Sequence, residues 1–318
     1  MSKPVVLLYE GMHEKAVAWL AERAEVRMAP SLDEALLIPL LADVDGIVIR
    51  ANGRVTRRMM QAAPRLKVVG RHGVGVEAID RVAAAELGIA VVNTPFSNDE
   101  SVAEHCLGMM LALGKRLLEA DRALRLGDWE ARYRLIGIEL EGKTLGLVGF
   151  GKIGQRLAQM AHFGLRMPIL YHDLVAYPDV EQALEARRVS FEDVLSLSDV
   201  VSVHVPLIKE THGLINEAAL RKMKPSAFLI NSSRGLVVDP AALRRALQEG
   251  WIAGAGLDVF DPEPLPRGDP LLSQENVVVS PHMAAHTEEG LYRMAQVVED
   301  VMAVIEGRAP TYPVPPPG

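Results

Sequence analysis

Short apolar runs alternate with helical patterns over the first hundred residues. The apolar runs Val5–Tyr9, Ile47–Arg50, Lys67–Gly70 and Ala90–Asn93 predict strands, and the spacing of apolar residues over His13–Glu22 predicts a helix. Such alternation is typical of a parallel sheet covered by helices on both faces. The pattern therefore predicts a first α/β domain.

A second alternating series begins at Thr144. The helices predicted for it include Ile153–His162 and Pro240–Glu249. Six strands are predicted, at Thr144–Val148, Pro168–His172, Val200–Val205, Ala227–Asn231, Gly254–Leu257 and Val277–Val279. That content is typical of a doubly wound nucleotide-binding domain.

The segments outside the two series suggest how the domains are connected. A helix after Asn93-Thr94-Pro95 carries a broad apolar face, which could pack on its own sheet or on a second subunit. The last helix is predicted from Thr287, its cap, to about Glu306, and it is free to return to the first domain. We therefore predict one domain from residues 1–98 and 287–318 and another from residues 99–286. The Pro-rich tail after Ala309 is predicted to be extended and poorly ordered.

Composition narrows the class of protein. A length of 318 residues with 49% hydrophobic residues suits two domains with sizeable cores. The net charge of −7 argues against nonspecific nucleic-acid binding, which needs a basic face. A single cysteine, Cys106, excludes an intramolecular disulfide, and the chain shows neither a signal peptide nor a membrane-spanning run. We expect a cytoplasmic protein without membrane or nucleic-acid partners.

The segment Gly149–Gly154, Gly-Phe-Gly-Lys-Ile-Gly, follows a predicted strand and opens a predicted helix. Gly149 would allow the tight turn, Gly151 the approach of a pyrophosphate, and Gly154 close packing of helix on strand, with Lys152 and Ile153 in the first helical turn. Asp173 ends the next strand, where a carboxylate would bind a ribose 2′-hydroxyl and repel a 2′-phosphate. This favours NAD over NADP. The alternative is a glycine-rich turn and a strand-terminal Asp unrelated to nucleotides.

Three polar residues follow later strands. Arg234 can bind a substrate carboxylate through its planar guanidinium, and His282 is an imidazole that can exchange a proton near neutral pH. Glu263 lies between two prolines and could fix the tautomer of that imidazole. Each of these three residues, taken singly, could have a purely structural role. Together, behind a dinucleotide motif, they indicate hydride transfer to or from a 2-oxo acid.

Other polar positions give weaker signals. His204 could line the cofactor cleft or be a packed residue. No spacing of histidines predicts a metal site. The turn Gly70–Gly75 could hold a small anion with its backbone N–H groups, and Arg50 and His72 could supply a polar or anionic-substrate pocket.

The chain resembles the D-isomer-specific 2-hydroxyacid dehydrogenase family over nearly its whole length. The segments that carry the resemblance are Arg71–Gly75, Asn93–Pro95, Ser101–His105, Gly142–Gly146, Gly149–Gly154, Ser202–Leu207, Asn231–Gly235, Gly256–Phe260 with Glu263-Pro264, and Ser280–His282. The resemblance implies a Rossmann NAD-binding domain inserted into a discontinuous flavodoxin-like substrate domain.

The resemblance also implies functional roles. His282 is the implied acid and base, Glu263 its partner, and Arg234 the binder of the carboxylate and oxo group. Asp258 is implied to hold the nicotinamide amide. His204 and Pro206 are also candidate cofactor-binding residues. The backbone at Val74 and Gly75 is implied to receive the substrate carboxylate. Family members are usually dimers built on residues 98–140.

We therefore predict an NAD-dependent dehydrogenase of a small, possibly anionic, D-2-hydroxy acid such as glycerate, phosphoglycerate or sulfolactate. Formate dehydrogenases of the same type are expected to have Gln at the position of Glu263, which argues against that activity. Two alternatives stay open. A phosphite-type dehydrogenase keeps the three polar residues, and a cofactor-sensing corepressor shares the fold.

Overall fold

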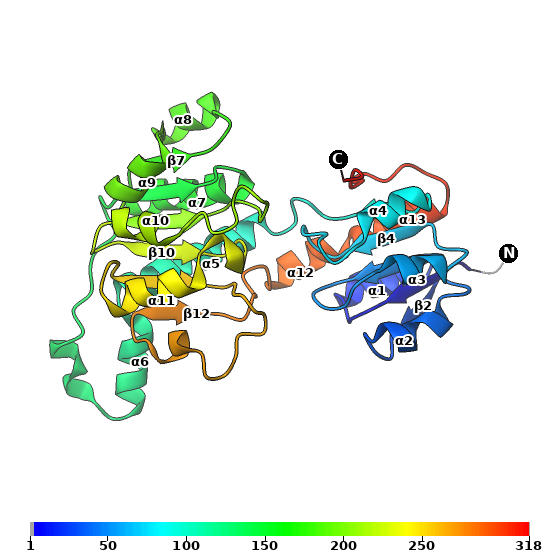
Figure 1. Ribbon diagram of the computed structural model, residues 1–318, viewed down its shortest axis with the longest axis horizontal. Coiled ribbons are helices and arrows are strands. Elements are labelled where there is room, and N and C mark those ends of the chain that lie inside the picture. Colours follow the sequence, from blue (N-terminus) through cyan, green and yellow to red (C-terminus); the bar gives the residue numbers. More distant parts are fainter. Residues whose placement is uncertain (1–2, 318) are drawn as a thin grey trace. The chain divides into compact units, whose positions relative to one another are not determined.

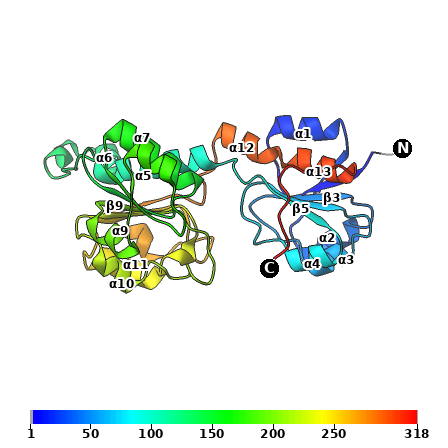
Figure 2. The same ribbon diagram turned by 90° about the horizontal axis from the view of Figure 1, so that it is seen from above.

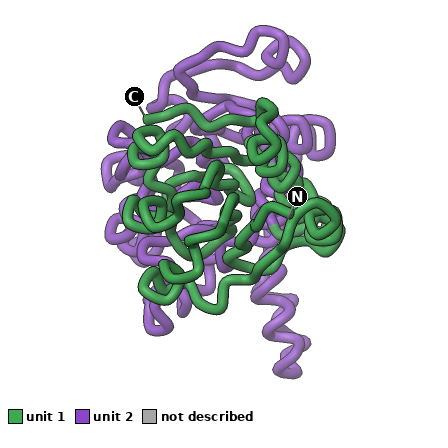
Figure 3. The backbone as a smooth tube through the Cα atoms, turned by 90° about the vertical axis from the view of Figure 1, so that its right-hand side faces the viewer, with its two compact units in different colours: residues 1–98, 286–318 green, residues 99–285 purple. Residues whose placement is uncertain are grey.

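The computed structural model describes residues 3–317, which divide into two compact units (Figures 1 and 3). Unit 1 lies within residues 1–98 and 286–318, and unit 2 is formed by residues 99–285. The chain thus leaves unit 1 after Asn98 and re-enters it at His286.

Unit 1 is a parallel sheet with helices on both faces. Its elements are β1 (Val5–Leu8), α1 (Glu14–Ala21), β2 (Glu25–Met28), α2 (Glu34–Leu37), η1 (Ile38–Leu40), β3 (Gly46–Ile49), α3 (Arg57–Gln61), β4 (Val68–Arg71), α4 (Arg81–Glu86), β5 (Ala90–Val92), α12 (Glu288–Ala295) and α13 (Val297–Ile305). The strand order is β2-β1-β3-β4-β5, and α1 and α13 cover one face while α2, α3 and α4 cover the other (Figure 2). This order is that of flavodoxin-like folds.

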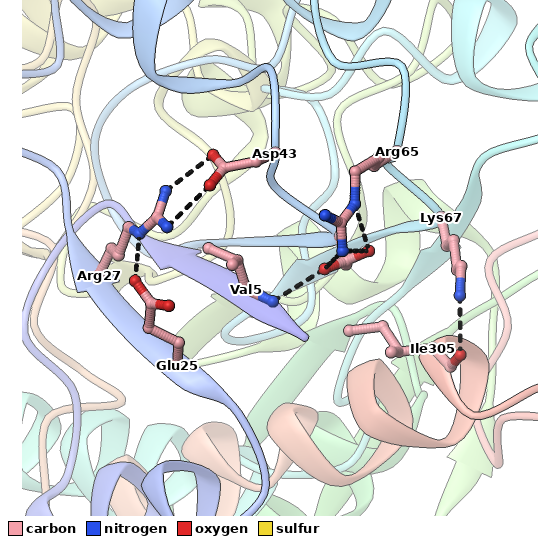
Figure 4. A network of polar contacts seen from close by, with 8 residues as sticks. Val5, Glu25, Arg27, Asp43, Arg65, Lys67 and Ile305 are labelled. Carbon is pink, nitrogen blue, oxygen red and sulfur yellow. Dashed lines mark hydrogen bonds and ion pairs between the residues drawn. The ribbon is translucent and has the colours of Figure 1, made fainter. Parts of the chain in front are cut away.

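Polar contacts gather at the amino ends of the unit 1 strands (Figure 4). The buried Asp45, just before β3, accepts a hydrogen bond of 2.8 Å from the Val5 N–H and an ion pair of 2.9 Å from Arg65. Arg27 of β2 binds Asp43 through two hydrogen bonds of 2.8 Å. This edge therefore has a structural role, and the opposite, carboxyl edge is where ligands of such sheets bind.

Unit 2 has the larger sheet. Its elements are α5 (Asp99–Gly114), α6 (Leu117–Arg125), η2 (Trp129–Tyr133), β6 (Leu145–Val148), α7 (Lys152–Leu165), β7 (Ile169–His172), α8 (Pro178–Leu184), β8 (Arg187–Arg188), α9 (Phe191–Leu197), β9 (Val200–Val203), α10 (Glu217–Lys222), β10 (Phe228–Asn231), η3 (Gly235–Val237), α11 (Pro240–Gln248), β11 (Gly254–Leu257), η4 (Pro270–Ser273) and β12 (Val277–Val279).

All seven strands of this sheet are parallel, in the order β12-β11-β10-β9-β6-β7-β8. Helices α5 and α7 cover one face, and α9, α10 and α11 the other (Figure 2). One apolar core lies under each face, with Phe150 and Tyr171 stacked at 4.0 Å in the first of them. The chain reverses direction across the sheet between β6 and β9, so the ligand-binding point expected for this topology is where these two strands end.

Two doubly wound parallel sheets were predicted, and this fold class is confirmed. The strand inventory was incomplete. β2 has no buried residue, and β8 consists of two exposed arginines, so neither produces an apolar run. Unit 2 therefore has seven strands where six were predicted.

The end of the chain also differs from the prediction. Thr287 caps a helix as expected, with its Oγ1 accepting from the Gly290 N–H at 3.0 Å, but the helix ends at Ala295 and α13 begins at Val297. The tail is extended, as predicted, but hydrogen bonds hold it against the rest of unit 1, so it is not poorly ordered. It runs antiparallel to β5, with the Val314 N–H donating to Val91 O at 2.8 Å, and the buried Asp300 accepts from the Thr311 N–H at 2.7 Å.

Candidate active site

The glycine loop connects β6 to α7 at the point where the unit 2 sheet reverses direction. Gly149 has a positive φ of 94°, and a methyl group added there would lie 2.7 Å from His204 O, at the end of β9. A methyl group on Gly154 would lie 2.6 Å from Gly149 O, whereas one on Gly151 would have no atom within 4 Å. Two glycines thus permit close packing and the third leaves open space before the amino end of α7. This cradle fits a dinucleotide pyrophosphate.

Asp173 lies beside the loop, after β7. Its Oδ2 accepts from the Phe150 N–H at 2.6 Å and its Oδ1 from the Val175 N–H at 3.1 Å, so the carboxylate is fixed by two backbone donors. Arg188 of β8 donates to the backbone oxygens of Asp173 and Leu174 at 2.8 and 3.0 Å. The sequence analysis did not identify Arg188, because it lies 15 positions after Asp173 and outside the apolar pattern.

Other predicted cofactor residues surround the same turn. His204 has its Nε2 2.8 Å from Ser202 Oγ, and burial lowers the pKa of His204 to about 4, so its imidazole is neutral at physiological pH. Pro206 is exposed and accepts a 2.5 Å hydrogen bond from Thr211 Oγ1. Lys152 is exposed and Ile153 half-buried in the first turn of α7.

Glu263 and His282, far apart in sequence, are in contact. Glu263 Oε2 lies 2.7 Å from His282 Nδ1, and Oε1 accepts from the Phe260 N–H at 3.0 Å. Burial alone would raise the pKa of Glu263, but the hydrogen bonds from His282 and Phe260 and the charges of His282 and Arg234 lower it below its ordinary value. Glu263 is therefore a carboxylate, and since a carboxylate only accepts, His282 Nδ1 carries a proton.

His282 has an unusual backbone. Its φ is 49°, in the left-handed region, which costs free energy for a residue other than glycine. Its N–H donates to Asp258 O at 2.7 Å. The Asp258 side chain is fully buried and accepts from the N–H groups of Met283 and Ala284, both at 2.9 Å. Asp258 thus accepts hydrogen bonds from three backbone N–H groups of the turn that carries His282.

Arg234 stands on a loop that Asn231 fixes. The buried Asn231 amide donates to Arg234 O at 3.0 Å and accepts from the Ser233 N–H at 3.1 Å, while the Arg234 guanidinium donates to Ser233 O at 2.8 Å. A methyl group on Gly235 would lie 2.1 Å from Phe260 O. The glycine therefore lets the Arg234 loop pack directly against the loop that leads to Glu263.

Within unit 1, the other predicted substrate residues follow β3 and β4. Arg50 donates to Gly11 O at 2.9 Å, and His72 is buried. Asn93 donates to Val74 O at 2.8 Å and Arg71 donates to Gly75 O at 2.6 Å. Neither the Val74 nor the Gly75 N–H donates a hydrogen bond within residues 3–317.

Among residues 3–317, no three His, Cys, Asp or Glu side chains are grouped so that they could hold a metal ion. Over that range the structure also contains no helix with the length and apolar character required to cross a bilayer.

The chain is similar to known proteins in sequence and in structure. Residues 107–284 match the family profile described as D-isomer specific 2-hydroxyacid dehydrogenase, NAD binding domain. The chain is 40% identical over 316 residues to a glyoxylate reductase of Korarchaeum cryptofilum, covering 97% of this chain and 95% of that protein. It is 38% identical to D-3-phosphoglycerate dehydrogenase of Archaeoglobus fulgidus, covering 95% of this chain and 57% of that protein.

A solved structure of a Thermus thermophilus protein superposes with a TM-score of 0.92 at 39% identity, covering 98% of this chain and all of the other. A glycine loop at the turning point of the sheet, with a Glu–His pair beside an arginine loop, is thus found in a chain whose relatives are named dehydrogenases and reductases. The chain belongs to the D-isomer specific 2-hydroxyacid dehydrogenase family and is an NAD-dependent oxidoreductase.

Proposed function

We propose that this enzyme reduces small 2-oxo acids to D-2-hydroxy acids with NADH, and catalyses the reverse oxidation. The hydrogen bond between Glu263 and His282 is the observation that carries the proposal. When bound, the nicotinamide supplies or accepts the hydride, and the chain's own residues handle the proton and the substrate's charge.

His282 is the proposed proton donor in reduction. Its Nδ1 proton is held by Glu263, so Nε2 is the nitrogen that exchanges a proton with the substrate oxygen. The Glu263 carboxylate fixes the tautomer and orientation of the imidazole for this transfer.

Arg234 is the proposed binder of the substrate carboxylate and oxo group. Its charge lies close enough to contribute to the lowered pKa of Glu263. A guanidinium there can polarise the oxo group and hold the carboxylate through charge-assisted hydrogen bonds. The unbonded N–H groups of Val74 and Gly75 support their predicted role as further carboxylate donors. The roles of Arg50 and His72 stay predictions.

The substrate is proposed to be a two- or three-carbon 2-oxo acid, glyoxylate or hydroxypyruvate, or an anionic analogue such as phosphohydroxypyruvate or sulfopyruvate. Support comes from relatives named glyoxylate reductase and D-3-phosphoglycerate dehydrogenase. A cytoplasmic location is likewise proposed, and the buried single thiol of Cys106 needs no oxidising compartment.

The test is NADH oxidation against these four acids and pyruvate, with chiral analysis of the product. His282→Ala should lower kcat about 10³-fold without weakening NADH binding, because it removes the proton donor alone. His162→Ala on α7 is the matched control and should retain full activity. NADH binding without turnover of any acid would favour a sensor, and full activity of His282→Ala would overturn the proposed mechanism.

NAD preference is proposed to depend on Asp173. Replacing it with Ala should weaken NADH binding and narrow the discrimination against NADPH, because the acceptor for the ribose hydroxyl and the repelling charge are both lost. Binding measured by fluorescence titration checks this. An unchanged ratio of the two affinities would contradict the assignment.

We further propose a homodimer formed through an arm of residues 117–138. This segment exposes large apolar side chains, with Leu126 81% and Trp129 62% exposed, as well as Tyr133 and Ile136. So much apolar surface on one segment is typical of a protein interface. Leu126→Glu with Trp129→Glu should give a monomer by light scattering, and Phe163→Glu on α7 is the exposed control. A dimer that persists in the arm variant would contradict the proposal.

A further inference from the structure

A partly buried series of hydrogen bonds connects α5 to the turn that carries His282. His105 Nε2 lies 2.8 Å from Ser280 Oγ, and Ser280 Oγ lies 2.6 Å from Asp258 Oδ1. Asp258 in turn accepts from the backbone N–H groups of Met283 and Ala284. These residues stand on α5, after β12 and after β11.

The direction of the hydrogen bonds follows from what each group can donate. Ser280 Oγ donates its one hydroxyl proton to Asp258 Oδ1, which also accepts from the Met283 N–H. Ser280 Oγ can then only accept from His105. The proton of His105 is therefore on Nε2, which donates to Ser280 Oγ and also lies 3.7 Å from Asp258 Oδ1.

This series of hydrogen bonds ends at the turn that carries His282, whose backbone conformation has to be imposed by its surroundings. His282 adopts a left-handed conformation, and its N–H donates to Asp258 O. A non-glycine residue persists in that conformation only where its surroundings impose it. Both the main chain and the side chain of Asp258 hold this turn, and Ser280 and His105 fix the side chain of Asp258 in place.

The next residue of α5 makes a parallel contact. Cys106 Sγ lies 3.0 Å from Ser232 Oγ, on the loop that carries Arg234, and burial raises the pKa of the Cys106 thiol to about 12, so it stays a neutral thiol. Consecutive residues of one helix thus contact the loops of two proposed active-site residues.

We propose that His105 is a positioning residue that acts through Ser280 and Asp258 to hold His282 in its reactive orientation. This inference rests on the proposed role of His282. It also assigns Asp258 a role in supporting this turn, because the Asp258 side chain is fully buried and accepts three hydrogen bonds.

The experiment compares His105→Leu with His105→Gln in the full-length enzyme. Leu removes the donor, so kcat should fall about 10- to 100-fold, the cost of a small misplacement of a reacting group. Gln can place an N–H near the position of Nε2 and should restore most of the rate. NADH affinity should be unchanged in both, and His162→Leu is the matched control.

Ser280→Ala completes a double-mutant cycle. It removes the link between His105 and Asp258, so its effect on kcat should not add to that of His105→Leu. The pH profile of kcat should also change in His105→Leu, because the Glu263–His282 pair would lose its fixed geometry, whereas a purely structural role would lower thermal stability without altering the profile.

The outcomes separate this inference from the proposed function. If His282→Ala is inactive while His105→Leu and Ser280→Ala retain wild-type kcat, His105 has no positioning role. Equal losses in His105→Leu and His105→Gln, or additive effects with Ser280→Ala, would also overturn it. If His282→Ala is fully active, the proposed function fails instead. Should His105→Leu not fold, Ser280→Ala and His105→Gln still decide the question.

Discussion

The imidazole of His72 gives a quantitative prediction about acid stability. His72 follows β4 and is 3% exposed. Burial, and then the positive charges of Arg50 and Arg71, lower the pKa of His72 to about 3, although hydrogen bonds with its own backbone and that of Leu291 oppose this. At neutral pH it therefore contributes no positive charge for an anionic substrate.

The sign of the effect on folding follows from proton binding. In the unfolded chain a histidine has a pKa near 6.5, so between about pH 6.5 and pH 3 the unfolded state binds more protons here than the folded state. The free energy of unfolding must then fall as the pH is lowered through this range. Two pH units below 6.5, at about pH 4.5, the loss from His72 alone is about 3 kcal/mol.

Trp19 provides an assay for unit 1, because it lies on α1 and the other two tryptophans, Trp129 and Trp251, lie in unit 2. In a background with Trp129→Phe and Trp251→Phe, urea unfolding followed by fluorescence reports on unit 1. His72→Asn removes the titrating group, so its unfolding free energy should fall less steeply with decreasing pH, by about 3 kcal/mol between about pH 8 and pH 4.5. Equal pH dependence in the two proteins would refute the reasoning.

Three other changes test separate features of the structure. Gly149→Ala should abolish NADH binding measured by fluorescence, because the new methyl group meets backbone atoms at 2.7 Å, whereas Gly164→Ala, with no atom within 4 Å, should bind normally. Glu263→Gln should lower kcat of the reduction, because a neutral amide replaces the carboxylate that accepts from His282 Nδ1; an unchanged kcat would contradict the pairing. Asp300→Asn should cost about 1–3 kcal/mol of unfolding free energy in urea titrations, because it weakens two partly buried hydrogen bonds that a buried carboxylate accepts from the tail.

The features that sequence reasoning could find are local ones. The strand, turn and helix around Gly149–Gly154 are predictable because their glycine spacing and apolar pattern occur within a few residues. β2 was missed because its exposed edge position imposes no apolar pattern. The break between α12 and α13 at Gln296 was also missed, since the apolar spacing continues across it.

Contacts between residues far apart in the sequence produce no such local pattern. His105 and Ser280 are 175 positions apart, and their hydrogen bond depends on how α5 packs against the ends of β11 and β12. Burial of His72 is likewise a product of tertiary packing. A polar residue after a strand suggested a binding group, but the sequence does not show which of these side chains face inward.

The docked tail has a consequence for self-association. β5 is the outermost strand on its side of the unit 1 sheet, and an uncovered edge of this kind can recruit a strand from another molecule. Residues 312–314 occupy that edge by pairing with Val91 and Asn93. Pro310, Pro313 and Pro315 have no N–H group, so the tail itself is a poor template for a further strand. The tail thus ends the sheet and protects the protein against edge-to-edge aggregation.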